Sequence, residues 1–248
     1  MIAIEMRRLL TISLRQPVEF FLGLMLLTLL FFGVRAVAVS MFPNAGGGHA
    51  ASVLPLGFLA WAVINNVVSF VHGEVNKDIK SGVFETIFLR PRLIEKVIFA
   101  RSLYAVLHSV IVAGGLWLIF SLLSGSLASF LSPALYILVF LSILWGMPMG
   151  LFAASLSVIT RQSGAMILSL HLIVAALLVV PAFTKQIASL PYLLPVSSLS
   201  VFVARPDAWT FAGSCFSCLC WMAVAVAGWN GAKALAIRHG SADSSAYL

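Results

Sequence analysis

Six long apolar runs constrain this chain more than any other feature of its sequence. A helix needs about 20 mainly apolar residues to cross roughly 30 Å of hydrocarbon, and each run is long enough. None alternates apolar and polar residues at period two, as the strands of an outer-membrane barrel do. We therefore predict an all-α integral membrane protein with six transmembrane helices. The predicted spans are residues 18–42, 51–72, 103–123, 133–160, 165–183 and 209–229.

The composition agrees with this prediction. Of the 248 residues, 61% are apolar and only 9% are charged, whereas soluble domains average about 45–50% and 25%. One ordinary core of this size would not hide such an excess of apolar side chains. Soluble, disordered and disulfide-rich classes are excluded.

The basic residues predict the orientation. There are 15 Lys and Arg against 8 Asp and Glu, and the excess follows topology because cytoplasmic loops of membrane proteins collect Lys and Arg. We therefore predict a multi-pass protein of the cell (inner) membrane with both termini cytoplasmic, and no nucleic-acid partner. Arg35, Lys185 and Arg205 are predicted to lie on the outer side of the membrane. The other twelve, predicted inside, are Arg7, Arg8, Arg15, Lys77, Lys80, Arg90, Arg92, Lys96, Arg101, Arg161, Lys233 and Arg238.

An alternative for the first run is a signal peptide. Residues 1–38 have a basic start, an apolar stretch and the small-residue sequence Ala36-Val37-Ala38. The charged leader before the run is long for a signal peptide, and cleavage would leave five spans. We therefore favour six spans.

The chain divides into two parts. Residues 1–16 form an amphipathic helix with Leu9 and Leu10 in its apolar stripe, and residues 17–248 form the six-span transmembrane domain. We predict that the first helix lies at the cytoplasmic membrane surface, with Arg7, Arg8 and Arg15 near anionic lipid. The alternative is that it simply extends the first span.

Residues 73–102 are predicted to form the largest cytoplasmic loop, and residues 184–208 the largest external segment. Within the loop, residues 83–89 have the pattern of a short amphipathic helix, because Phe84, Ile87 and Phe88 recur on one face. Pro91 ends it. Such apolar side chains would be costly to leave in water, which favours docking to a partner over the alternative of a solvated linker.

This loop resembles that of type-2 ABC transporter permeases, the ABC-2 exporters. The resemblance lies in Glu74, the spacing Gly82-x-x-Glu85 and Pro91, together with the number of spans, the N-terminal amphipathic segment and the Pro-bearing stretch before the last span. In that family the element is a coupling helix that docks on a separate ATP-binding subunit. The resemblance thus implies ATPase coupling by Glu74, Gly82, Phe84, Glu85, Phe88 and Pro91.

The resemblance also implies the division of labour of an exporter. The sequence has no G-x-x-x-x-G-K-[ST] motif, so ATP and Mg²⁺ would be bound by a cytoplasmic P-loop subunit, with no cofactor in this chain and no enzymatic activity of its own. A second permease protomer, identical or not, would complete the transport route.

Three other functions compete with this one. A haem exporter B-like permease of cytochrome c biogenesis has a similar length and a comparable loop. A non-transporting membrane scaffold needs no coupling loop. A membrane enzyme needs clustered His, Asp or Glu near an interface, and the sequence offers no such cluster.

Four polar residues within the predicted spans are candidates for a substrate route: Asn65, Asn66, His108 and His171. Polar groups at membrane depth are costly, so they usually have a function or a partner. The alternative, which we favour, is hydrogen bonding between helices. Gly146, Gly150 and Ala154 predict close helix packing. The three cysteines, Cys215, Cys218 and Cys220, are expected to be buried thiols and not metal ligands.

Overall fold

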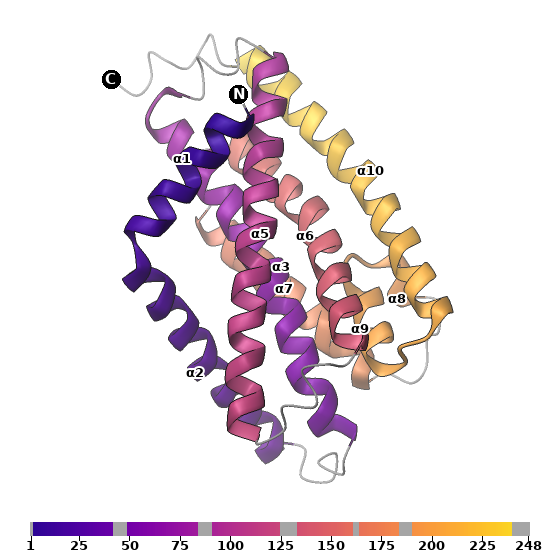
Figure 1. Cartoon of the computed structure of the whole chain (residues 1–248). Helices are drawn as coiled ribbons and strands as arrows, with labels where there is room; N and C mark the ends of the chain where they lie inside the picture. The colour runs from indigo at the N-terminus through magenta and orange to yellow at the C-terminus, as the bar shows by residue number, and fades with distance from the viewer. Residues whose placement is uncertain are drawn as a thin grey trace.

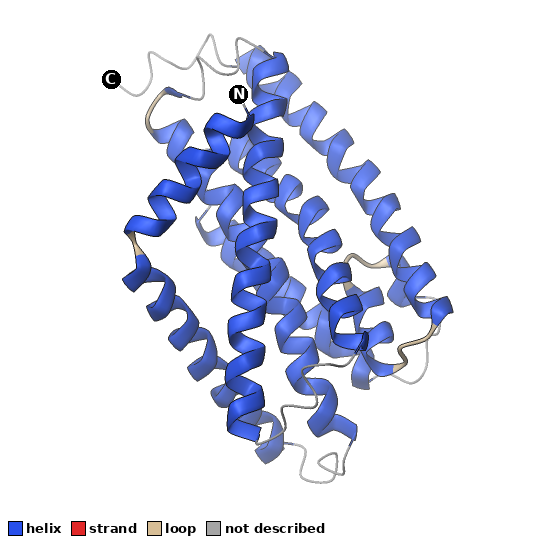
Figure 2. Cartoon of the chain, in the orientation of Figure 1, coloured by secondary structure: helices blue, strands red, loops and turns tan. Residues whose placement is uncertain are grey.

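The computed structural model describes residues 2–41, 49–83, 91–124, 133–160, 164–183 and 190–239, which are mostly helical and contain no strand. Figures 1 and 2 show an elongated bundle in which the N-terminus, the end of α3, the start of α5 and the end of α10 lie at one end of the molecule. The helices are α1 (Ile2–Arg15), α2 (Pro17–Met41), α3 (His49–Lys80), α5 (Pro91–Ser124), α6 (Pro133–Thr160), α7 (Gly164–Phe183), α8 (Leu190–Leu193), α9 (Ser197–Ala204) and α10 (Ala208–His239).

The helices have the length and composition of a multi-pass membrane protein. Among the described residues, four segments are long and apolar enough to cross a bilayer: Pro55–Lys80, Glu95–Leu122, Pro133–Thr160 and Ala208–Ala236. Helices α1 and α2 add a fifth if they are counted as one span bent by 76°. Each of the six predicted spans coincides with a helix, and the number of crossings stays a prediction.

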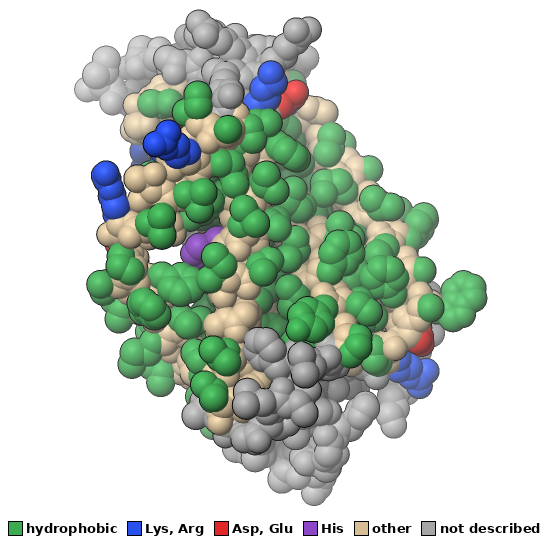
Figure 3. All heavy atoms as spheres, in the orientation of Figure 1, with side chains coloured by type: hydrophobic (Ala, Val, Ile, Leu, Met, Phe, Trp, Pro, Cys, Tyr) green, Lys and Arg blue, Asp and Glu red, His purple; other side chains and the backbone are tan. Residues whose placement is uncertain are grey.

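The face seen in Figure 3 matches a membrane environment. Hydrophobic side chains cover its middle, and the Lys, Arg, Asp and Glu side chains lie toward its two ends. This distribution is expected because charged groups at the bilayer centre are costly.

Helices α3 and α6 form the centre of the bundle. In the most apolar stretch of each of these two helices 56% is buried within the protein, against 22% in α10. They approach closely because α6 carries glycine at the contact: a Cβ on Gly146 would lie 3.0 Å from Cγ2 of Val67. Gly150 faces both Val67 and Val71, and Ala154 is fully buried in the same cluster. The predicted small-residue contact is confirmed.

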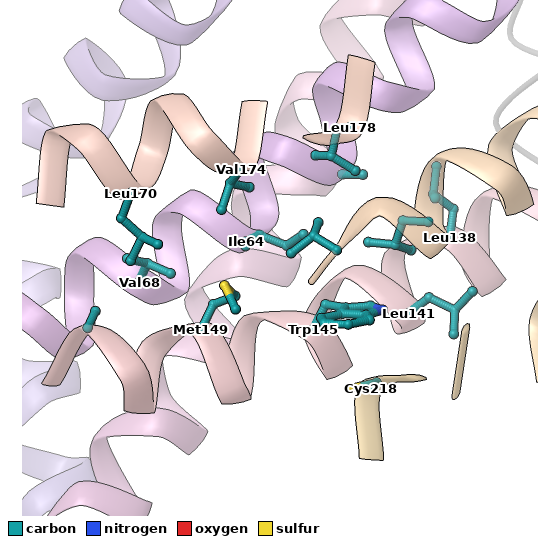
Figure 4. Close-up of a cluster of buried hydrophobic side chains, with 14 of the residues drawn as sticks. Ile64, Val68, Leu138, Leu141, Trp145, Met149, Leu170, Val174, Leu178 and Cys218 are labelled. Carbon is teal, nitrogen blue, oxygen red and sulfur yellow. The ribbon is translucent and has the colours of Figure 1, made fainter. Parts of the chain in front are cut away.

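The main core lies where α3, α6, α7, α9 and α10 meet. Trp145 of α6 is completely buried there, and Figure 4 shows it beside Leu141 and Met149, with Cys218 nearby. Its indole N–H donates to Oγ of Ser214 over 3.2 Å, and that hydroxyl lies 3.1 Å from Oγ of Ser198. The one polar group of this large side chain is therefore satisfied.

Two predicted connections differ from the structure. The predicted loop at 73–102 is helical over most of its described part, because α3 continues to Lys80 and α5 already begins at Pro91. The predicted external segment at 184–208 contains α8 and α9, and Val196, Leu199 and Phe202 are buried in the main core. Both segments contact helices distant in sequence, the end of α3 through the ion pairs of Glu74 and Asp78, and α9 through the main core.

Candidate functional site

The charged end of the bundle holds six ionised side chains in mutual contact, which we call the ionic cluster: Glu5 and Arg8 of α1, Glu74, Lys77 and Asp78 of α3, and Arg101 of α5. Three are basic and three are acidic, so the charges balance. Helical spacing explains the local part, since Glu5 and Arg8, and likewise Glu74 and Lys77, are three residues apart.

Arg101 is the central cation of the ionic cluster. Its Nε lies 3.0 Å from Oε1 of Glu5, and its Nη1 lies 2.6 Å from Oδ2 of Asp78. The Arg101 side chain is only 4% exposed. A guanidinium this deeply buried needs opposite charges around it. Glu5 of α1 and Asp78 of α3 provide them.

Arg8 joins α1 to α3 directly. Its Nη2 lies 2.8 Å from Oε1 of Glu5 and 2.8 Å from Oε2 of Glu74. The other oxygen of Glu74 accepts a hydrogen bond from Nζ of Lys77 over 2.8 Å. Both oxygens of Glu74, whose side chain is 8% exposed, are therefore used within the chain.

The segment that resembles a coupling helix follows α3 in the sequence, the helix that carries Glu74, Lys77 and Asp78 of the ionic cluster. Helix α3 ends where Gly82 adopts a φ of 70°, and the Gly82 N–H donates to the carbonyl of Ile79 over 3.2 Å. A left-handed residue at this place is the usual role of glycine after a helix. Phe84, Glu85 and Phe88 lie outside the described residues. Pro91 is the first residue of α5, where a missing N–H costs nothing.

The other basic residues of α1 are exposed. Arg7 and Arg15 are both on its solvent- or lipid-facing surface, and their contact with anionic lipid stays a prediction. Leu9 is 3% exposed and anchors the helix by apolar contact. The helix thus has one buried side, fixed by Leu9 and the ionic cluster, and one open side.

The intramembrane polar residues are arranged along α3. Asn66 Nδ2 lies 3.0 Å from Nδ1 of His108 and donates to Oγ of Ser109 over 2.8 Å, both on α5. One turn along α3, Ser69 Oγ lies 3.3 Å from Nε2 of His171 on α7. Successive polar positions of α3 therefore contact different helices.

His72 continues this pattern, since its Nδ1 is hydrogen-bonded to Oγ of Ser157 on α6. Asn65 differs from the other predicted residues: its Oδ1 is buried, and within the described part of the chain it has no hydrogen-bond partner. The structure thus brings Asn66 to His108, places His171 with Ser69, and leaves Asn65 apart.

Sequence reasoning missed half of the ionic cluster. It did not single out Glu5, Asp78 or Arg101 as partners of Glu74 and Arg8. The available signal was helical: Glu74 and Asp78 are four residues apart and share a face if α3 continues past the apolar stretch. Nothing in the sequence places α1 against that face.

The described residues contain no group of three or more His, Cys, Asp or Glu side chains that could hold a metal ion. Cys218 is buried, whereas Cys220 is exposed. Comparison of the chain with protein-family models, with curated proteins and with solved structures finds no match.

Proposed function

We propose that this chain is the membrane-spanning permease subunit of an ATP-driven exporter of the ABC-2 type. A cytoplasmic P-loop subunit would bind ATP and Mg²⁺ and hydrolyse the nucleotide. Two permease protomers would enclose the route of a substrate leaving the cytoplasm. The proposal rests on the sequence of the segment between α3 and α5 and on the ionic cluster of the helices that this segment connects.

The observation that carries the proposal is the ionic cluster. It ties α1 to the last turns of α3 and to α5 at Arg101, and α3 and α5 are the two helices that residues 84–90 connect in the sequence. A force applied to that segment would reach α1 as well, because Arg101 contacts both Glu5 and Asp78. A simple linker between two spans would not need this bracing.

The polar residues along α3 support a packing role more than a substrate route. Asn66, His108 and His171 each contact a polar side chain of a neighbouring helix. Such interhelical hydrogen bonds are worth about 0.6 kcal/mol each in membrane proteins. We therefore assign them to holding α3 against α5 and α7, and the substrate is not specified by them.

Two measurements test this proposal: whether the chain binds an ATPase, and whether ATP hydrolysis by that ATPase is coupled to export. The full chain, purified with an affinity tag from its native membrane, should bring down a P-loop ATPase, and the pair reconstituted in vesicles should export substrate during ATP hydrolysis. In Phe84→Ala the loss of an apolar contact should weaken ATPase binding by about 2 kcal/mol, which is roughly 30-fold in Kd. Glu85→Lys should do the same by introducing repulsion.

A matched control is Lys80→Ala, at an exposed residue of α3 close to the loop. Lys77 is less suitable because it pairs with Glu74. Membrane insertion should be normal in all three variants. Full transport with undiminished ATPase binding in Phe84→Ala and Glu85→Lys would reduce the loop to a linker, and absence of any ATPase partner would favour the scaffold.

A further inference from the structure

A pocket of about 200 Å³ lies between α6, α7 and α10, with Pro195 of the segment between α8 and α9 on its wall. Its lining is almost entirely carbon and includes Met149, Val174 and Ala225. Figure 4 shows Met149 and Val174 among the core side chains around Trp145. The polar groups of this region do not contribute to the pocket.

The strong side-chain donor among the described lining residues is already used. The indole N–H of Trp221, a lining residue, donates to the carbonyl of Leu193 over 3.1 Å. The Trp221 ring therefore offers apolar surface to the pocket. A ligand held here would make apolar contacts only, so a headgroup, a sugar or a peptide would lose its hydrogen bonds on entering.

The pocket lies at the middle depth of the spans. Met149 lies slightly past the middle of Pro133–Thr160, and Val174 lies at the middle of Gly164–Phe183. In a bilayer whose hydrocarbon is roughly 30 Å thick, this level holds the methyl ends of acyl chains. They are the apolar groups present there at the highest concentration.

The volume and the opening also fit a chain end. An apolar cavity of about 150 Å³ stays dry and binds a six-carbon ring, so 200 Å³ accommodates a chain end of at least that size. Ile173 lines the pocket and is 53% exposed, and its neighbour Leu172 is 64% exposed. The pocket is thus continuous with the surface of α7 that faces lipid.

We propose that this pocket binds the methyl end of a phospholipid acyl chain. Occupancy restores the dispersion contacts that Met149, Val174 and Trp221 lack beside an empty space. The chain end enters between α7 and α10 while the headgroup stays at the membrane surface. The site is independent of the exporter proposed above, because it needs neither the coupling loop nor an ATPase.

The test uses the full chain in phosphatidylcholine vesicles that contain a phosphatidylcholine with a photoreactive diazirine at one acyl-chain end. After irradiation, adducts are located by peptide mass spectrometry. Lipid at the protein surface should label Leu172. We expect adducts also on Met149 and Val174, which line the pocket and are only 4% and 2% exposed. Adducts confined to exposed residues would overturn the proposal.

The second arm of the experiment uses a variant in which a larger side chain fills the pocket. In Ala225→Phe the added ring occupies the pocket, and labelling of Met149 should fall at least tenfold while labelling of Leu172 persists. Ala223→Phe is the matched control, because Ala223 is exposed on the opposite side of α10 and the change should leave Met149 labelled. Equal labelling of Met149 in both variants would refute the site.

A third variant covers the case in which Ala225→Phe fails to insert. Ile173→Trp enlarges a half-exposed side chain at the opening without crowding the interior. It should also reduce labelling of Met149 relative to Leu172. Unchanged labelling of Met149 in this variant would mean that the adduct does not arise through the pocket.

Discussion

Individual polar side chains in this bundle form hydrogen bonds with backbone groups that have no partner within their own helix. Pro148 lies within α6 and has no N–H, so the carbonyl of Leu144, four residues earlier, loses its helical partner. The thiol of Cys218 on α10 donates to that carbonyl over 3.3 Å. The proline and the cysteine, 70 positions apart, are therefore one structural unit, which explains a buried cysteine without invoking a metal.

Asp207 caps the first turn of α10. Its Oδ1 accepts a hydrogen bond of 2.7 Å from the Thr210 N–H, and its own N–H donates to Oγ1 of Thr210 over 3.2 Å. This reciprocal pair is a capping box. The hydrogen bond from the Thr210 N–H holds the pKa of Asp207 below its ordinary value despite an opposing effect of desolvation.

The lowered pKa predicts a pH-dependent contribution to stability. The ionised cap stabilises the folded state above the unfolded pKa, and this contribution is lost as the pH falls through the folded pKa. Asp207→Ala should therefore lower Tm most at pH 6, and the difference from wild type should shrink toward pH 3. Thermal unfolding in detergent, monitored by tryptophan fluorescence at each pH, gives the Tm of the variant and of the wild type. A difference that grows toward pH 3 would contradict the assignment.

Among the helices, the contact between α3 and α6 depends on glycine. Gly146→Leu should overpack Val67, because even a Cβ at this position would lie 3.0 Å from Cγ2 of Val67. We expect the free energy of unfolding to fall by about 1–3 kcal/mol. The measurement is unfolding in a titration with a denaturing detergent, followed by circular dichroism.

The control for this prediction is Gly228→Leu on α10, where an added Cβ meets nothing within 4 Å. Replacing glycine within a helix without crowding should leave stability unchanged or raise it by up to about 1 kcal/mol. An equal loss in both variants would mean that glycine is needed for backbone flexibility, and that close approach to Val67 is not the reason.

At the same scale, hydropathy predicted the helices better than their ends. All six predicted spans lie on helices, because whether a segment is apolar enough to leave water depends only on its own composition. The end of α3 was missed because Glu74 and Asp78 are compensated by Arg8 and Arg101, whose proximity depends on the fold. Helix α9 was not predicted, and Ser198 within it is buried against Ser214 of α10.

Across the whole molecule, packing is uneven. The spans of α3 and α6 are largely enclosed, while α10 keeps much of its apolar surface open, including Phe216, Leu219 and Val224. Lipid covers this surface in a single protomer. In the proposed exporter, a second protomer would need such an open apolar surface.

Among the described residues, the ionic cluster links α1 to α3 and α5 by ion pairs, so its loss should release α1. Arg101→Met removes the cation that contacts both Glu5 and Asp78 and leaves part-buried carboxylates with fewer partners. Breaking a buried ion pair typically costs about 3–5 kcal/mol. We therefore expect faster trypsin cleavage after Arg7 and Arg15 in the folded protein, measured by mass spectrometry over time.

Lys233→Met is the matched control at the same end of the bundle. It removes the 3.1 Å pair between Lys233 and Glu95, and the Glu95 side chain is 61% exposed. An exposed pair contributes about 0–1 kcal/mol, so cleavage within α1 should keep its wild-type rate. If Arg101→Met and Lys233→Met were cleaved at the same rate, Leu9 and its apolar contacts would be what holds α1. The cluster could not then carry force from the α3–α5 connection to α1, and the main support for the exporter proposal would be lost.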